Sequence, residues 1–449
     1  MASLLRASFV GVGSLSLALI TSGCGDDRGR TGDDELGIEG GLTLDEGTST
    51  ASTGGEQVDD DESGVKFDMD ITDAMGNGGD CPGGTGMPGD VEFSFIWVAN
   101  SPQGTVSKID TKTGLEVARY VAGPGVPDPS RTSVNLYGDV VVADRNGGLA
   151  KIAVEEEGCE DFNGVPGIQT SQGPGDVLAW GADECVVWQL PLAASGQFGP
   201  RPVAWEGGDQ NGCALPNPRV WIGYRDAANG YFKRLDGSSG AILDEVTIPW
   251  AQYTAAWGPY GGATNKDGDF WVVGHSVGPL VRIDSDNLVP EIIEIPVPPS
   301  GSKFTYGMAL DADGRPWVAG GDYVYNYDPA TAQWTFINVP SGSMRGLMVD
   351  KEGRAWVANN GASFLVEIDT VSKTLINPAV PLAGALTPVG ISIDVDGKVW
   401  VVDQGASMAF KVDPDTYQTL LTVSGLVSPY TYSDMTGAGL GLVTFPPTE

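Results

Sequence analysis

A short motif recurs through the second half of the chain. It reads YGGATNKDGDFWVV at 260–273, YGMALDADGRPWVA at 306–319, RGLMVDKEGRAWVA at 345–358 and VGISIDVDGKVWVV at 389–402. Each copy has an apolar stretch, an Asp/Gly turn and a second apolar stretch with tryptophan. A repeat of this kind constrains the fold more than any other feature, because each unit must bury its apolar face against its neighbours.

The tryptophans mark the successive units. They stand at Trp97, Trp221, Trp271, Trp317, Trp356 and Trp400, with Val141 at one further place. The intervals are 44, 80, 50, 46, 39 and 44 residues. Four strands in about 40–50 residues are typical of a propeller blade. We predict an all-β fold, a seven-bladed β-propeller over 91–446, with an insertion at 156–184. An eighth blade around 183–190 is the alternative.

The two ends of the propeller are predicted to share one blade. Glu92–Asn100 already reads as a tryptophan-bearing second strand, with no first strand of the repeat type before it. Tyr430–Thr444 follows the last complete blade and has no other place in the repeat. We expect this C-terminal segment to supply the inner strand of blade one, which closes the ring and removes an open sheet edge.

The first 90 residues have the features of a signal peptide followed by a linker. Residues 1–23 resemble a signal peptide, and Thr21-Ser22-Gly23-Cys24 resembles the lipobox of bacterial lipoproteins, which predicts a lipidated Cys24. Residues 24–90 are acidic and glycine-rich, and are predicted to be a disordered linker. We expect a protein anchored by lipid at the bacterial cell envelope, at the outer membrane or cell surface, or a secreted protein if Cys24 is not lipidated.

The net charge limits the kinds of partner that the protein can bind, and the cysteine content predicts disulfides. The chain has 59 acidic and 25 basic residues, a net charge of −34, which speaks against nucleic-acid binding. We expect a monomer whose partners are the membrane, through the lipid anchor, and an unidentified small ligand or protein. Export makes disulfides the expected state of the other four cysteines. Cys159 and Cys185 bracket the insertion and are predicted to pair, which leaves Cys81 with Cys213.

Three groups of residues were weighed as sites. The turns that begin at Asp311, Asp350 and Asp394 look like calcium loops but suit hairpin turns better, because they lack the other calcium ligands. In the insertion, Asp161 and Asn163 occupy the first and third places of a calcium loop. The third group is the mouth of the propeller channel, where the second strand of each blade ends.

At this mouth, four neighbouring blades present oxygen-bearing side chains. They are Asn100, Asp144, Asn359 and Asp403, a set that suits Ca²⁺ or Mg²⁺, with closure of local turns as the alternative. The opposite side presents the candidate ligand-binding residues Tyr260, Tyr306, His275, Arg345 and Trp257. Trp250 and Tyr253 lie in the loop before Tyr260, and ordinary packing is the alternative for this aromatic side.

The motif GISIDVDGKVWVV resembles the blades of virginiamycin B lyase (streptogramin lyase) and, more loosely, of NHL-repeat propellers. In the lyase family, a histidine and a glutamate act with magnesium. The matching histidine places hold Tyr260, Tyr306, Arg345 and Val389, and the glutamate places hold Gly274, Gly320, Asn359 and Asp403. The resemblance therefore implies the fold and not the activity, and no catalytic residue is assigned.

Three functions remain open from the sequence. The leading hypothesis is an envelope-anchored lipoprotein propeller that binds a ligand or protein through its channel mouth without catalysis. The first alternative is a metal-dependent lyase or hydrolase of the streptogramin-lyase type. The second is a structural module of the cell surface. Geometry at the mouth decides between them, because fold alone does not imply function.

Overall fold

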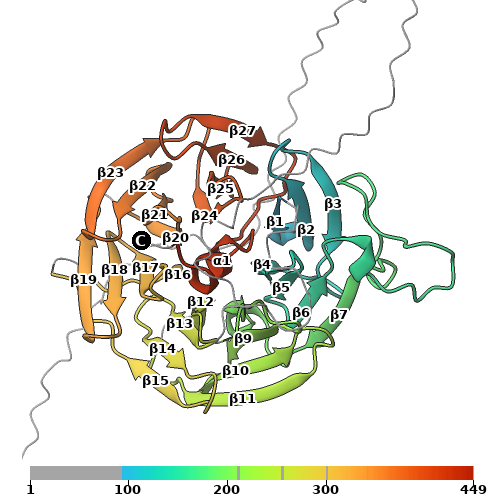
Figure 1. The fold of residues 1–449 in the computed structure, drawn as a ribbon, viewed down its shortest axis with the longest axis horizontal. Coiled ribbons are helices and arrows are strands. Elements are labelled where there is room, and N and C mark those ends of the chain that lie inside the picture. The colour runs from blue at the N-terminus through green and yellow to red at the C-terminus, as the bar shows by residue number, and fades with distance from the viewer. Residues whose placement is uncertain (1–93, 210–212, 254–256, 300–301, 341, 448–449) are drawn as a thin grey trace, which may run out of the picture. The chain divides into compact units, whose positions relative to one another are not determined.

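The computed structural model describes residues 94–447, except 210–212, 254–256, 300–301 and 341. The described chain forms seven antiparallel sheets arranged in a ring around a central axis (Figure 1). The sheet of blade one has three strands, and the other six sheets have four. The seven-bladed propeller is confirmed, and the alternative of eight blades is wrong. The predicted signal peptide, Cys24, Cys81 and the whole of the predicted linker lie outside the described residues.

The strands follow one another as simple meanders. Blade one is β1 (Phe95–Asn100), β2 (Thr105–Asp110) and β3 (Glu116–Val121), and blade two is β4 (Pro129–Val134), β5 (Val140–Asp144), β6 (Gly148–Ile152) and β7 (Val186–Pro191). Blade three is β8 (Val203–Trp205), β9 (Arg219–Arg225), β10 (Asn229–Asp236) and β11 (Ile242–Pro249). Blade four is β12 (Pro259–Thr264), β13 (Phe270–Gly274), β14 (Leu280–Ile283) and β15 (Pro290–Ile293).

The last three blades repeat this order. Blade five is β16 (Met308–Leu310), β17 (Pro316–Gly320), β18 (Tyr323–Asp328) and β19 (Gln333–Asn338). Blade six is β20 (Met344–Val349), β21 (Arg354–Asn359), β22 (Phe364–Asp369) and β23 (Thr374–Pro381). Blade seven is β24 (Pro388–Ile393), β25 (Val399–Asp403), β26 (Met408–Val412) and β27 (Thr419–Val423). The first strand of each complete blade lies innermost and the fourth lies at the rim.

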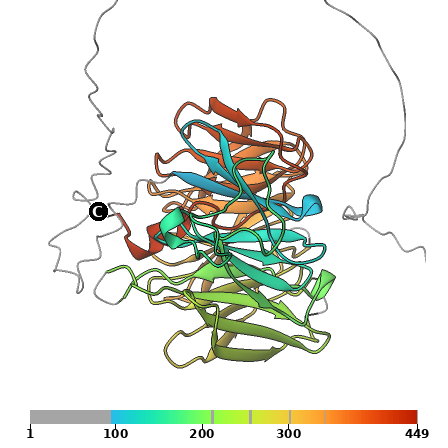
Figure 2. The ribbon, with the colours of Figure 1, turned by 90° about the vertical axis from the view of Figure 1, so that its right-hand side faces the viewer.

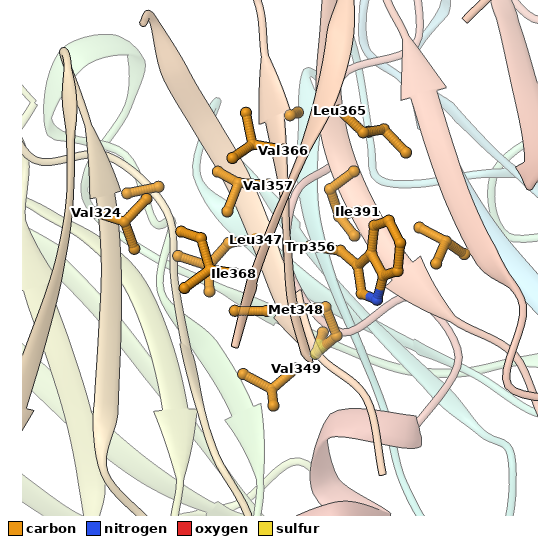
Figure 3. Close-up of a cluster of buried hydrophobic side chains, with 14 of the residues drawn as sticks. Val324, Leu347, Met348, Val349, Trp356, Val357, Leu365, Val366, Ile368 and Ile391 are labelled. Atoms are coloured by element: carbon orange, nitrogen blue, oxygen red, sulfur yellow. The ribbon is translucent and has the colours of Figure 1, made fainter. Parts of the chain in front are cut away.

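Burial changes from the inner strands to the rim. The second strands, such as β13 and β25, are buried along their whole length because blades pack on both of their faces. The rim strands β11 and β23 have mostly exposed or partly exposed residues. Figure 3 shows one of the resulting clusters, in which Leu347, Trp356 and Val366 of blade six pack with Val324 of blade five and Ile391 of blade seven. The core therefore lies between blades rather than at the centre.

The small residue at the start of each repeat sets the distance between neighbouring inner strands. A Cβ atom on Gly307 would lie 2.5 Å from the Arg345 carbonyl oxygen of the next blade, and one on Gly346 would lie 2.6 Å from that of Val389. Both distances are shorter than a van der Waals contact, so only glycine fits. The glycine thus lets inner strands approach closely around the channel.

The Asp/Gly turn of the repeat also fixes the marker tryptophan. In blades five, six and seven, Asp311, Asp350 and Asp394 accept two backbone N–H groups of their own turn through Oδ1. Through Oδ2, each accepts the indole N–H of Trp317, Trp356 or Trp400, at 2.9 Å in all three. The interpretation as hairpin turns is confirmed, and the aspartate additionally satisfies a fully buried indole donor.

The C-terminal segment lies against β1 as predicted. The Tyr430 N–H donates to the Ala99 carbonyl at 2.9 Å, the Ala99 N–H donates to the Thr431 hydroxyl at 2.7 Å, and the Trp97 N–H donates to the Met435 carbonyl at 3.0 Å. A Cβ atom on Gly390 of blade seven would lie 1.7 Å from the Thr431 carbonyl oxygen. The segment therefore takes the innermost position between blades seven and one and closes the ring.

The segment is not the regular strand that was predicted, because residues 430–437 form no strand and the sheet of blade one keeps three strands. Residues Ala438–Thr444 form the helix α1, which lies at one face of the ring of blades (Figure 2). Leu440 lines a small cavity beside Thr264 and Leu310, at the ends of inner strands β12 and β16. A Cβ atom on Gly439 would lie 2.9 Å from the Met348 sulfur, so a residue without a side chain suits the place where this helix packs on β20. Of the described residues, no helix is long and apolar enough to cross a membrane.

The insertion of blade two is tied by the predicted disulfide. Cys159 and Cys185 are bonded, with their Cα atoms 4.3 Å apart. Glu184 accepts the backbone N–H groups of Phe162, Asn163 and Gln169, which organises the loop from within. The pairing of Cys81 with Cys213 stays a prediction, because Cys81 lies outside the described residues.

We predict that Asp311→Ala lowers the free energy of unfolding by about 1–3 kcal/mol, because it leaves the buried Trp317 indole N–H without an acceptor. Thermal and denaturant unfolding of the purified protein would measure the change. The matched control is Asp313→Ala in the same turn, where the side chain is 64% exposed and pairs with Arg315. An exposed pair of this kind contributes about 0–1 kcal/mol. Equal losses in both variants would contradict the assigned role of Asp311.

Candidate functional site

The candidate site lies at the channel end where the inner strands begin. There, β4, β12, β20 and β24 each carry one extra residue opposite the second strand of the blade, a β-bulge. Bulges of this kind redirect a side chain. The bulged residues include Tyr260 of β12 and Arg345 of β20, and Arg131 follows directly after the bulge of β4. This geometry brings side chains from several blades together, and we call the assembly the mouth cluster.

Four tyrosines form the centre of the mouth cluster. The ring centroids of Tyr260 and Tyr306 are 4.9 Å apart, and Tyr432 lies 4.9 Å from Tyr306 and 5.6 Å from Tyr260. The Tyr430 hydroxyl bonds to those of both Tyr260, at 3.2 Å, and Tyr306. Tyr260, Tyr306 and Tyr432 are at most 5% exposed. Two blades and the C-terminal segment therefore meet at a single network of hydroxyl groups.

His275 packs onto this centre from the loop after β13. Its ring centroid is 4.5 Å from that of Tyr260, 5.8 Å from that of Tyr306 and 6.5 Å from that of Trp257. The Nδ1 atom is buried and has no hydrogen-bond partner among the described residues. Burial, followed by the charges of neighbouring arginines, lowers the pKa of His275 to about 3. The imidazole is therefore neutral at physiological pH.

Three arginines surround the tyrosines. The guanidinium carbon of Arg131 lies 4.7 Å from the Tyr260 ring centroid, that of Arg201 lies 5.7 Å from the same centroid, and that of Arg345 lies 4.7 Å from the Tyr306 centroid. Arg131 and Arg201 are 1% and 2% exposed. Burial lowers the pKa of Arg131 to about 9 and that of Arg201 to about 10, so both remain charged at neutral pH.

The predicted ligand-binding residues are thus found close together. Tyr260, Tyr306, His275 and Arg345 belong to the mouth cluster, and Trp257 lies at its edge, 37% exposed. Trp250 is instead fully buried against Phe232 in the core between blades three and four, with Tyr253 packed on it. The packing interpretation therefore holds for Trp250.

Each of the four oxygen-bearing residues accepts a backbone N–H group from the segment that leads into the adjacent inner strand or, for Asn100, into the C-terminal inner segment. The Asp403 carboxylate accepts the N–H groups of Leu386 and Thr387, at 2.9 and 3.0 Å, from the loop before its own inner strand. The other three residues make equivalent contacts. Asp144 accepts the backbone N–H group of Asp128 at 2.6 Å, Asn359 accepts that of Ser343 at 3.0 Å, and Asn100 accepts that of Val427 at 2.8 Å. Burial raises the pKa of Asp144.

These contacts give the four residues a shared structural role, and a cation bound between them stays a prediction. In the described part of the chain, no group of three or more His, Cys, Asp or Glu side chains is placed to hold a metal ion. In the insertion, Asn163 accepts the Val165 N–H at 2.7 Å and donates to Gln169 at 2.6 Å. Both of its polar side-chain atoms are therefore engaged in holding the loop.

Sequence reasoning missed four members of the mouth cluster: Arg131, Arg201, Tyr430 and Tyr432. Their blades depart most from the repeat, since blades two and three have no copy of the motif and blade one takes its inner segment from the far end of the chain. Reading the first residues of every inner strand, rather than only those of the recognisable repeats, would have found Arg131 and Arg201.

The mouth cluster presents aromatic rings, tyrosine hydroxyls and guanidinium groups. The histidine places of the lyase family hold tyrosine, arginine and valine, and the glutamate places hold glycine, asparagine and aspartate. Burial raises the pKa of Tyr306 and Tyr430 well above its ordinary value, so their hydroxyls stay protonated. Further along the channel, the cavity beside Leu440 is only about 30 Å³, room for one or two water molecules.

Comparison with known proteins supports the fold. No protein-family model and no curated protein matches the chain. A solved streptogramin B lyase matches with a TM-score of 0.51 at 16% identity, over 69% of this chain and 87% of that one. An inactivated virginiamycin B lyase from Staphylococcus aureus with quinupristin gives 0.48 at 16% identity, over 66% and 84%. AztD from Citrobacter koseri gives 0.47 at 15% identity, over 75% and 96%. The likeness to lyase-type propellers is confirmed at the level of the fold.

We predict that the His275 ring does not titrate between about pH 5 and 8, whereas an unperturbed histidine has its midpoint near 6.5. His275 is the chain's one histidine, so its ring signals can be followed by NMR without ambiguity. The folded-state pKa lies below the unfolded one, and the unfolded chain therefore gains a proton first as pH falls. The parent should lose stability relative to His275→Gln as pH falls from about 6.5 to 4. A midpoint near 6.5 would contradict the buried placement.

Proposed function

We propose that this protein is an envelope-anchored lipoprotein whose propeller binds a ligand, a small molecule or a segment of a protein, through the mouth cluster. The observation that carries the proposal is the meeting of buried aromatic and cationic side chains from blades two to six and the C-terminal segment at one channel end. Ligand sites combine apolar and aromatic walls with a few placed polar groups, and the mouth cluster has this composition.

The arrangement favours binding over the lyase alternative. An elimination needs a base within reach of the proton that it removes. Among the described residues, the charged groups that act on His275 are arginines, and they lower its pKa in addition to the effect of burial. Such a weak base suits a packing or hydrogen-bonding role better than proton abstraction.

The purified propeller can be tested with a panel of small aromatic compounds, followed by the ring signals of His275. We expect at least one compound to shift these signals saturably. Tyr306→Phe removes one hydroxyl of the network and should weaken binding about fivefold, near 1 kcal/mol for one hydrogen bond. Tyr137→Phe is the matched control, because its hydroxyl bonds to the Leu215 carbonyl from the turn between β4 and β5, at the end of the blade opposite the mouth. A panel without any shift, or equal effects of both variants, would refute binding at this mouth.

The anchoring part of the proposal rests on Cys24 and the apolar run before it. We expect the protein expressed in a bacterium to enter the detergent phase on phase partition, because two or more acyl chains anchor stably. Cys24→Ala should move it to the aqueous phase while leaving the propeller folded. A Cys24→Ala protein that still enters the detergent phase would show that the lipobox interpretation is wrong.

A further inference from the structure

The centre of the mouth cluster has more hydrogen-bond donors than acceptors. The hydroxyls of Tyr260, Tyr306 and Tyr430 carry three protons but share two hydrogen bonds. The Tyr432 hydroxyl and the Nε and Nη2 atoms of Arg131 are buried and have no partner among the described residues. Buried polar groups are normally paired, so a surplus of one kind indicates a missing partner of the other kind.

Arg131 shows the shape of that partner. Its Nη1 atom donates to the Ser130 carbonyl at 3.0 Å, and the face of the guanidinium group stacks on the Tyr432 ring. The edge formed by Nε and Nη2 is the one without an acceptor. Its two parallel N–H groups match two oxygens of one carboxylate or phosphate group.

The charge around this edge is uncompensated. Arg201 uses its Nη atoms on the carbonyls of Gly196, Gln197 and Gly199, and Arg345 donates to the Met344 carbonyl at 3.2 Å. Within the described ranges, neither these two residues nor Arg131 forms an ion pair. The nearby acidic residue Asp128 already pairs with Arg145 at 2.5 Å. Burial of an unpaired charge costs free energy. The chain has 59 acidic residues, yet none of those described forms an ion pair with these arginines, which indicates a place for an anion from outside the chain.

We infer that the mouth cluster is an anion site, in which the Nε/Nη2 edge of Arg131 binds an oxyanion group, carboxylate or phosphate, carried by the ligand. This inference rests on the proposed function and names the chemistry of its ligand. Arg201 and Arg345 supply further positive charge, and the tyrosine hydroxyls donate hydrogen bonds to the same oxygens. The tyrosine rings contact the apolar part of the ligand.

The mouth cluster is closed by its own side chains, since Arg131, Tyr260 and Tyr306 are all nearly inaccessible. Binding therefore requires a rearrangement, and association should be slower than about 10⁵ M⁻¹s⁻¹, below the range typical of preformed sites. The C-terminal segment is the inner element without regular strand pairing, and it carries Tyr430 and Tyr432. We expect this segment to be the one that moves.

The experiment compares phenylacetate with phenylacetamide, which have nearly the same shape but differ in charge, and adds inorganic phosphate at matched ionic strength. Affinities are measured by calorimetry and by the His275 signals. We expect phenylacetate to bind at least about tenfold more tightly than the amide, a difference of about 1.4 kcal/mol. Phosphate binding without phenylacetate binding would assign the oxyanion to a phosphate, and the reverse would assign it to a carboxylate.

Two variants of Arg131 test its role. Arg131→Gln should reduce phenylacetate to the affinity of the amide, and Arg131→Lys should bind weakly because it keeps the charge and loses the paired donors. Arg315→Gln is the control and should bind like the parent, because Arg315 is a partly exposed arginine that pairs with Asp313 in the turn of blade five. Without ligand, Arg131→Gln should melt no lower than the parent, because it removes an unpaired buried charge.

The outcomes separate this inference from the proposed function. Equal binding of phenylacetate and its amide, or full binding by Arg131→Gln, would overturn the anion site and leave a mouth that binds neutral ligands. Absence of binding by every probe would overturn both. A strongly destabilised Arg131→Gln protein, together with unchanged anion binding by Arg131→Lys, would show that Arg131 acts only in packing.

Discussion

The hydrogen bond between a turn aspartate and the indole of the following tryptophan is the interaction on which the blades depend. It is repeated with the same geometry in blades five, six and seven. One carboxylate closes the hairpin between the first two strands and also fixes the largest side chain of the core between blades. Local turn chemistry and long-range packing are thereby satisfied by the same residue, which is the consistency that makes a sequence specify one fold. Blade three reaches the same result with Glu206, which accepts the indole N–H of Trp221 at 2.8 Å.

The sequence predicts the parts of this fold that repeat. The period of the tryptophans led to seven blades, the unpaired first blade led to closure by the C-terminal segment, and cysteines flanking an insertion led to one disulfide. The helix α1 was not predictable in the same way, because AGLGLVT reads equally well as a strand. Only the crowded end of the channel, a tertiary constraint, selects the helix over the strand.

The mouth cluster was predictable only in part. Tyr260, Tyr306 and Arg345 occupy equivalent places in recognisable repeats, so the pattern located them. Arg131 and Arg201 start inner strands of blades that do not show the motif, and the β-bulge that turns side chains toward the channel leaves no signal in the sequence. The oxygen-bearing residues showed the opposite difficulty, since aspartate or asparagine at a strand end looks the same whether it binds a cation or closes a turn.

The contact between Ala99 and Thr431 joins positions 332 residues apart. Blades two to seven are each built from neighbouring stretches of chain, whereas blade one can be completed only when the last stretch of the chain has been made. Closing so long a loop is entropically expensive, and contacts of high sequence separation make folding slow. Closure also slows unfolding, because every blade in the ring packs against two neighbours. Separation of one pair of blades therefore leaves each of them held by its other neighbour. The ring is therefore expected to owe its persistence to slow unfolding as much as to equilibrium stability.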